Sequence, residues 1–150
     1  MSVTIREAAL KRLIAAIALG LTACGLAACG QGAAPLQVTE ATYRAPLGST
    51  GIGVAYLSVT SPSADRIVGV SSPQADRVEM HASVMSGDQV SMKQLQEVVL
   101  PAGKPVEFAP GGMHLMVFGP KPLAEGATFP IQIELESGRT ETISLHPALR

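Results

Sequence analysis

The sequence predicts an all-β domain, a sandwich or a barrel, that follows an N-terminal export signal. Short apolar or alternating segments recur along the chain, and clusters of glycine, proline, serine and aspartate separate them. Helical periodicity is weak beyond the apolar N-terminal segment. The length of 150 residues allows one domain with a modest core. These observations favour a single β-domain over a helical or a two-domain protein.

The predicted strands follow one another between residues 52 and 145. Residues 77–85 and 89–100 flank Ser-Gly-Asp, which is a hairpin signal, so the second segment is expected to return along the first. The other segments alternate or are short apolar runs that end in turn residues. The remaining predicted strands are residues 52–60, 66–72, 104–108, 113–118, 129–135 and 140–145.

The first 28 residues are predicted to be a lipoprotein signal peptide. Arg6, Lys11 and Arg12 form a basic region, and the apolar run that follows at residues 13–21 is too short to cross a bilayer as a stable helix. The run Leu-Ala-Ala-Cys that ends at Cys29 resembles a bacterial lipoprotein processing site. The resemblance implies that Cys29 is lipidated and becomes the new N-terminus.

Two alternatives to Cys29 stay open. Leu-Thr-Ala-Cys, ending at Cys24, fits the same pattern less typically, and the leader could also be a plain secretory signal with two incidental cysteines. We favour Cys29 because a short tether without an apolar run follows it. The predicted organisation is a signal at 1–28, a tether at 29–35 and one domain at 36–150. This places the domain in the periplasm or cell envelope, with membrane contact only through a lipid anchor.

The composition of the processed chain excludes several classes of function. Both cysteines lie in the leader, so the domain has no disulfide, no thiolate zinc site, no cysteine nucleophile and no cysteine ligand for blue copper. Removal of the leader leaves eight basic and eleven acidic residues, a net charge of −3, which offers no footprint for nucleic acid. No Ser-His-Asp or paired-carboxylate pattern stands out, so we do not expect an enzyme.

Methionine and histidine are concentrated in one part of the domain. All five methionines of the processed chain fall between Met80 and Met116, and two of its three histidines, His81 and His114, fall there as well. A single methionine is more often core than ligand. Strand alternation separates the two cases, because Val78 and Met80 share one face of their strand while Arg77, Glu79 and His81 share the other. Met80 is therefore predicted to be core.

Strand alternation also assigns the residues of the segment Met-His-Leu-Met to two opposite faces. His114 and Met116 share one face of the predicted strand, whereas Met113 points with Leu115 and is expected to pack in the core. A thioether is a soft neutral donor and imidazole is borderline, so together they favour Cu(I) over Mg²⁺ or Ca²⁺. Methionine also keeps a soft donor in an oxidising compartment without the risk of disulfide formation. Met85 shares the parity of His81 and could act as a spare donor.

The spacing of four of these residues resembles a family motif. Ten residues separate His81 from Met92, twenty-one separate Met92 from His114, and Met116 follows after one more residue. This H-x10-M-x21-H-x-M pattern is similar to that of the periplasmic copper chaperone family called PCuAC. The resemblance extends through the flanking segments, from about residue 38 to residue 145.

The resemblance implies a cupredoxin-like, immunoglobulin-like Greek-key β-sandwich that binds Cu(I) through His81, Met92, His114 and Met116. It further implies a metallochaperone that delivers copper to the CuA centre of cytochrome c oxidase, with the CuA domain of subunit II and Sco-type copper proteins as partners. Periplasmic copper buffering would use the same ligands, and a metal-free β-sandwich interaction module is the remaining alternative. His146 stands where some relatives carry a Met/His-rich tail, and we expect it to be a solvent-exposed terminal residue.

Overall fold

The computed structural model describes residues 34–87 and 89–148, so the predicted signal segment and the Cys24 and Cys29 candidates lie outside the described residues. Over these two ranges the chain forms ten β-strands, and no helix long and apolar enough to cross a membrane occurs in them. The strands are β1 (Gln37–Arg44), β2 (Ile52–Thr60), β3 (Asp65–Ser71), β4 (Arg77–Ser86), β5 (Gln89–Leu95), β6 (Val98–Leu100), β7 (Pro105–Phe108), β8 (Met113–Phe118), β9 (Phe129–Leu135) and β10 (Thr140–Pro147).

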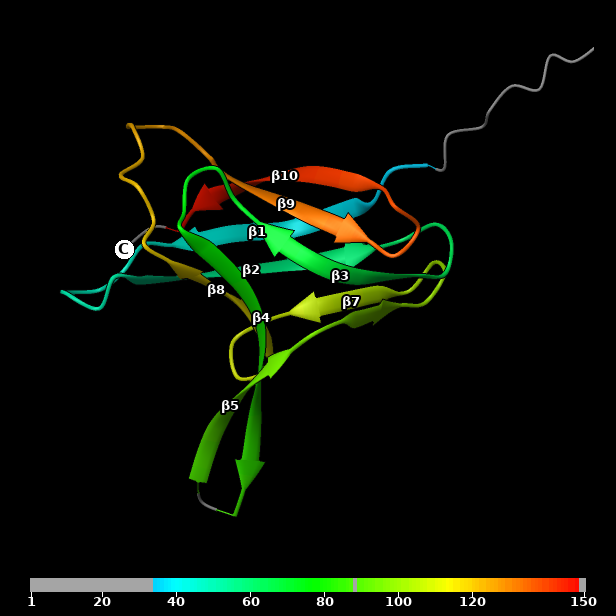
Figure 1. The fold of residues 1–150 in the computed structure, drawn as a ribbon, viewed down its shortest axis with the longest axis horizontal. Helices are drawn as coiled ribbons and strands as arrows, with labels where there is room; N and C mark the ends of the chain where they lie inside the picture. Colours follow the sequence, from blue (N-terminus) through cyan, green and yellow to red (C-terminus); the bar gives the residue numbers. More distant parts are fainter. Residues whose placement is uncertain (1–33, 88, 149–150) are drawn as a thin grey trace, which may run out of the picture. The chain divides into compact units, whose positions relative to one another are not determined.

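The strands pair into one ladder that folds into two layers (Figure 1). Its order is β5-β4-β8-β7-β2-β1-β10-β9-β3-β6, and β2 also pairs with β8. Most of the pairs are antiparallel. β7 and β8 run parallel where they pair, and β1 and β10 run parallel with Thr42 opposite His146 and Tyr43 opposite Pro147. The pair of β1 and β10 joins the layer that contains β4 and β8 to the layer that contains β9 and β3. The predicted all-β sandwich is therefore confirmed.

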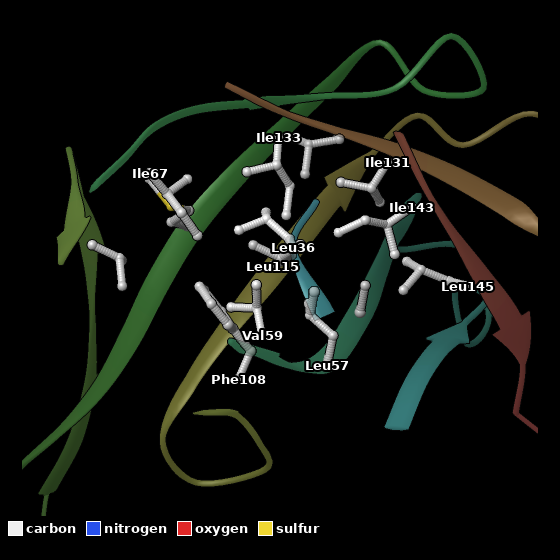
Figure 2. Close-up of a cluster of buried hydrophobic side chains, with 14 of the residues drawn as sticks. Leu36, Leu57, Val59, Ile67, Phe108, Leu115, Ile131, Ile133, Ile143 and Leu145 are labelled. Carbon is white, nitrogen blue, oxygen red and sulfur yellow. The ribbon is translucent and has the colours of Figure 1, made fainter. Parts of the chain in front are cut away.

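The core lies between the two layers, where alternate residues of each strand point inward. In β2 every second residue is buried, and β9 buries Phe129, Ile131, Ile133 and Leu135 in the same way. Figure 2 shows inward-pointing side chains of both layers meeting in one cluster. Across the layers the Tyr43 ring stacks on Phe129, with 4.2 Å between the ring centroids. Full burial of each large apolar side chain contributes about 1.5–3 kcal/mol.

Two parts of the chain differ from the strands that the sequence predicts. Strand β1 was not expected, because it is largely polar and a bulge between Thr39 and Thr42, with Glu40 at φ 54°, interrupts its alternation. The expected strand at residues 89–100 is two strands: β5 pairs with β4, whereas β6 pairs with β3 in the other layer. The chain changes layer there because Val98 and Leu100 are buried in the core while β5 is mostly exposed.

Asp65 ties the start of β3 to the turn between β9 and β10. One carboxylate oxygen accepts hydrogen bonds from the backbone nitrogens of Arg66 (2.8 Å) and Ser137 (3.2 Å), and the other accepts one from the Ser137 hydroxyl (2.7 Å). Arg139 lies 3.7 Å from the second oxygen. The hydroxyl hydrogen bond is the main cause that lowers the pKa of Asp65, which partial burial opposes. The carboxylate therefore stabilises the fold in its charged form.

We expect Asp65→Asn to lower the free energy of unfolding at pH 7 by about 1–3 kcal/mol, because it removes charge from three hydrogen bonds. A lowered folded-state pKa gives stability that is present above the unfolded carboxyl value of about 4 and is lost as pH falls through the folded value. The difference in free energy of unfolding between wild type and variant should thus shrink below about pH 4. Denaturant titrations between pH 7 and pH 2 measure it, with Glu125→Gln in an exposed loop as the control. A difference that stays constant over this range would contradict the role of the charge.

Candidate metal site

The candidate site lies on one face of three neighbouring strands, β5, β4 and β8. Residues directly opposite each other in an antiparallel pair project to the same face. His81 of β4 is opposite His114 of β8, and Met116 of β8 is opposite Glu79, two residues before His81. Met92 of β5 is opposite Ser83, two residues after His81. The pairing therefore brings the four predicted ligands to the same face, although they come from three strands.

The four side chains differ in how far they are covered. His114 is buried at 5% exposure, and the side chain of His81 is 14% exposed. The two imidazole rings face each other obliquely, with 6.1 Å between their centroids and 32° between their planes. Met116 is partly buried, whereas Met92 is 62% exposed on the edge strand β5. The site thus has a covered histidine pair and one thioether that is open to solvent.

The turn before β8 holds the ring of His114. Residues 109–112 form a β-turn in which the Gly112 nitrogen donates to the Ala109 carbonyl at 3.0 Å, and Gly111 has φ 79°. Proline in the second position and glycine with positive φ in the third are typical of a type II turn. The Gly112 carbonyl accepts hydrogen bonds from His114 Nδ1 at 3.1 Å and from the Ser83 nitrogen at 3.1 Å. This backbone oxygen therefore connects the ring to both β8 and β4.

His81 is held by a carboxylate of its own strand. Its Nε2 donates to Glu79 Oε2 at 2.9 Å, and Arg77 Nε donates to Glu79 Oε1 at 2.6 Å. The hydrogen bond from His81 is the main cause that lowers the pKa of Glu79; partial burial opposes it, and Arg77 adds to it. The other ring nitrogen, His81 Nδ1, is buried and has no hydrogen-bond partner. A buried nitrogen with a free lone pair is costly unless something binds it.

The donor set fits a soft metal ion better than a hard one. Two imidazoles and two thioethers match the preferences of Cu(I), whereas Mg²⁺ and Ca²⁺ require oxygen ligands. Both oxygens of Glu79 already accept hydrogen bonds. Within residues 34–87 and 89–148, no group of three or more histidine, cysteine, aspartate or glutamate residues is placed to hold a metal ion. The Nδ1 of His81 has no hydrogen-bond partner, so its lone pair is available for a metal–nitrogen bond.

The other methionines and the last histidine lie where the sequence predicts. Met80 is 3% exposed in the core, and Met113 is partly buried against it, so both packing predictions are confirmed. Met85 is 71% exposed and opposite Val90, on the same face as His81 but farther along the β4–β5 hairpin, which extends from the sandwich in Figure 1. His146 is exposed in β10, several strands from β4 and β8 in the ladder, and does not join the site.

Sequence reasoning missed two groups that support the histidines. The sequence places Glu79 on the face of His81 but assigns it no role, and it gives no indication of the Gly112 carbonyl. The alternation Arg-x-Glu-x-His was the available signal for the first, because residues two apart on a strand share a face. No side-chain pattern could have indicated the carbonyl, since its direction depends on the turn.

Comparison with known proteins places the chain in a family. The family described as "Putative lipoprotein LpqE-like" matches residues 36–146. A curated relative, "Putative lipoprotein Lxx21020" of Leifsonia xyli subsp. xyli (strain CTCB07), is 29% identical over 142 residues, which is 88% of this chain and 84% of the relative.

Solved structures share the fold over most of the chain. The copper-bound PCuAC domain from PmoF2 superposes with a TM-score of 0.61 at 21% identity, covering 77% of this chain and 93% of that domain. The solution structure of CuI-DR1885 from Deinococcus radiodurans gives a TM-score of 0.60 at 28% identity, covering 79% of this chain and 81% of the other. The predicted resemblance to PCuAC domains is thus confirmed, and the family match over residues 36–146 shows that the chain belongs to the LpqE-like lipoprotein family.

Proposed function

We propose that this protein is a Cu(I)-binding metallochaperone of the cell envelope, with His81, Met92, His114 and Met116 as the copper ligands. The observation that carries the proposal is the strand register, which gathers two imidazoles and two thioethers on one face of β5, β4 and β8. Similar domains support it, since that of PmoF2 is described as copper-bound and DR1885 as its CuI form. The proposed role is binding and transfer of a metal ion, without catalysis.

The donor set suits an ion that must be both held and released. All four donors are neutral when they ligate, so the site adds no negative charge to the attraction of a cation, unlike a set of thiolates. Met92 stands 62% exposed on the edge strand β5, whereas His114 is buried. An incoming ligand from another protein can therefore replace Met92 while the histidines still hold the ion.

We further propose that the recipient is the CuA centre of cytochrome c oxidase subunit II, with Sco-type proteins as other partners in the same assembly. Exposure of Met92 favours direct transfer, because the recipient's ligand must reach the ion before the last donor lets go. Buffering of envelope copper would use the same four ligands. Transfer of Cu(I) to an isolated apo CuA domain separates the two, since a buffer would keep the ion when the recipient is present at equal concentration.

The anchoring proposal rests on the leader and on the family. Cys29 follows a basic region, a short apolar run and Leu-Ala-Ala, and the matching family and the Leifsonia relative are both described as lipoproteins. A lipid on Cys29 would hold the domain at a membrane of the periplasm or cell envelope through a short tether. Such an arrangement would keep the copper site close to membrane-bound recipients.

We expect the protein to bind one Cu(I) through two nitrogens and two sulfurs and not to bind Mg²⁺ or Ca²⁺ at this site. Met92→Leu and Met116→Leu delete a sulfur and keep the volume, so stability should change by less than about 1.5 kcal/mol. Cu(I) affinity should fall at least about tenfold for each, equivalent to about 1.4 kcal/mol, in competition with a chromogenic Cu(I) chelator.

Met80→Leu is the matched control, because Met80 is a core residue at 3% exposure. The Cu(I) affinity of this variant should equal that of the wild type. X-ray absorption of the Cu(I)-loaded forms counts the sulfur neighbours. Unchanged sulfur scattering in the Met92→Leu, Met116→Leu double variant would show that other donors hold the ion. Met85→Leu tests the spare donor, and we expect it to leave the scattering of the wild-type site unchanged.

For the anchor, we expect Cys29→Ser to abolish metabolic labelling with a radioactive fatty acid and to leave an unprocessed or soluble protein. Cys24→Ser should keep both labelling and processing, because Cys24 lies within the segment that is removed. The reverse pattern would move the processed N-terminus to Cys24. Labelling that survives in both single variants would be inconsistent with either cysteine acting alone.

A further inference from the structure

We propose that the two histidines present different ring nitrogens to the metal, Nδ1 of His81 and Nε2 of His114, and that Glu79 is the positioning residue that sets the first of them. The inference rests on the proposed function, because it concerns the atoms of the same site. It goes beyond the ligand set, since the H-x10-M-x21-H-x-M spacing specifies residues and not ring nitrogens.

The choice at His81 follows from its hydrogen bond. A carboxylate oxygen accepts but does not donate, so the 2.9 Å contact with Glu79 Oε2 places the ring hydrogen on Nε2. The neutral ring then carries its lone pair on Nδ1. That atom is buried and unpartnered, which is the condition expected of a nitrogen that awaits a metal ion.

The choice at His114 is the opposite one. Its Nδ1 lies 3.1 Å from the Gly112 carbonyl, which also can only accept, so this nitrogen carries the hydrogen and Nε2 carries the lone pair. The carbonyl is itself anchored, because it accepts a second hydrogen bond from the Ser83 nitrogen at 3.1 Å. The backbone thus sets one tautomer and a side chain sets the other.

Glu79 can set the tautomer only if its carboxylate keeps its orientation, and Arg77, which itself lies over Phe118, holds it. Arg77 Nε donates to its other oxygen at 2.6 Å, and the Arg77 guanidinium lies over the Phe118 ring at 4.0 Å from the centroid. Phe118 is opposite Arg77 in the pairing of β4 with β8, so the strand register places this contact. The contacts run from Phe118 through Arg77 and Glu79 to His81 along one face of the sheet.

The arrangement also explains why Glu79 is a positioning residue and not a ligand. It lies opposite Met116, close to the candidate site, but both of its oxygens are engaged by His81 and Arg77. A carboxylate behind a ligating imidazole fixes the ring orientation and raises the basicity of the ligating nitrogen. Loss of such a partner typically lowers metal affinity by about 10–100-fold.

Long-range ¹H–¹⁵N correlation spectra of histidine-labelled protein test the tautomers directly, before and after addition of one equivalent of Cu(I). Without copper, we expect the non-protonated nitrogen to be Nδ1 in His81 and Nε2 in His114. Copper should then shift those same two nitrogens. A larger copper-dependent shift at Nε2 of His81 than at its Nδ1, with Cu(I) still bound, would overturn this inference and leave the proposed function intact. Failure of the wild type to bind Cu(I) would overturn both.

Variants test the role of Glu79. Glu79→Leu should remove the preference for the Nε2–H tautomer of His81 and weaken Cu(I) binding by about 10–100-fold. Glu79→Gln has one acceptor oxygen for two donors, Arg77 and His81, so it should weaken or reverse the tautomer preference and also lower the affinity. Glu107→Leu, at an exposed position of β7, is the matched control and should change neither quantity. If Glu79→Leu kept the wild-type tautomer and affinity, Glu79 would not be the positioning residue. Should Glu79→Leu fail to fold, the wild-type spectra and Glu79→Gln still decide the question, because a glutamine variant with both the wild-type His81 tautomer and the wild-type affinity would also overturn the role of Glu79.

Discussion

The pairing of β4 with β5 on one side and β8 on the other is the constraint on which the candidate site depends. No two of the three strands contribute all four donors, and only this register places His81 opposite His114 with both methionines on the same face. The register is held from the opposite face, where Val78, Met80, Leu115 and Val117 are buried in the core. A slip of one residue would turn these side chains to solvent, so core burial also fixes the geometry of the donors.

The candidate ligands differ in how far they are buried and held by hydrogen bonds. His114 is buried and bound to a backbone carbonyl, and His81 is bound to a carboxylate that Arg77 holds in turn. Met92 has no comparable cover, because it stands on the edge strand at 62% exposure. A site with a fixed pair of imidazoles and an open thioether is suited to ligand exchange at one side. This difference links the fold to the proposed transfer of copper, since the exposed donor is the one that a recipient can displace.

The charged side chains nearest the candidate site, Glu79 and Arg77, orient the ring of His81 and are not themselves candidate ligands. Glu79 is the carboxylate on this face of β4, and its hydrogen bonds to His81 and Arg77 engage both of its oxygens. The negative charge therefore lies behind the imidazole and next to a guanidinium, where it orients the ring without offering a hard ligand. This separation keeps the candidate donor set soft, and a soft donor set favours Cu(I) over divalent cations that prefer oxygen.

Alternation of apolar and polar residues was sufficient to predict β2, β8 and β9 with their observed bounds, and to assign Met80 to the core and His81 to the other face. Local periodicity determines which face a residue takes, but not which strand lies beside it, because strand pairing joins residues far apart in the chain. The bulged strand β1 and the change of layer between β5 and β6 were therefore decided by tertiary contacts. So were the hydrogen bonds of the two rings: Glu79 was visible on the correct face, but the Gly112 carbonyl takes its direction from the turn and from its pairing with β4. The sequence by itself determined the candidate donor types and the faces of His81, His114 and Met116, whereas only the tertiary structure decided which nitrogen of each histidine engages a hydrogen-bond partner.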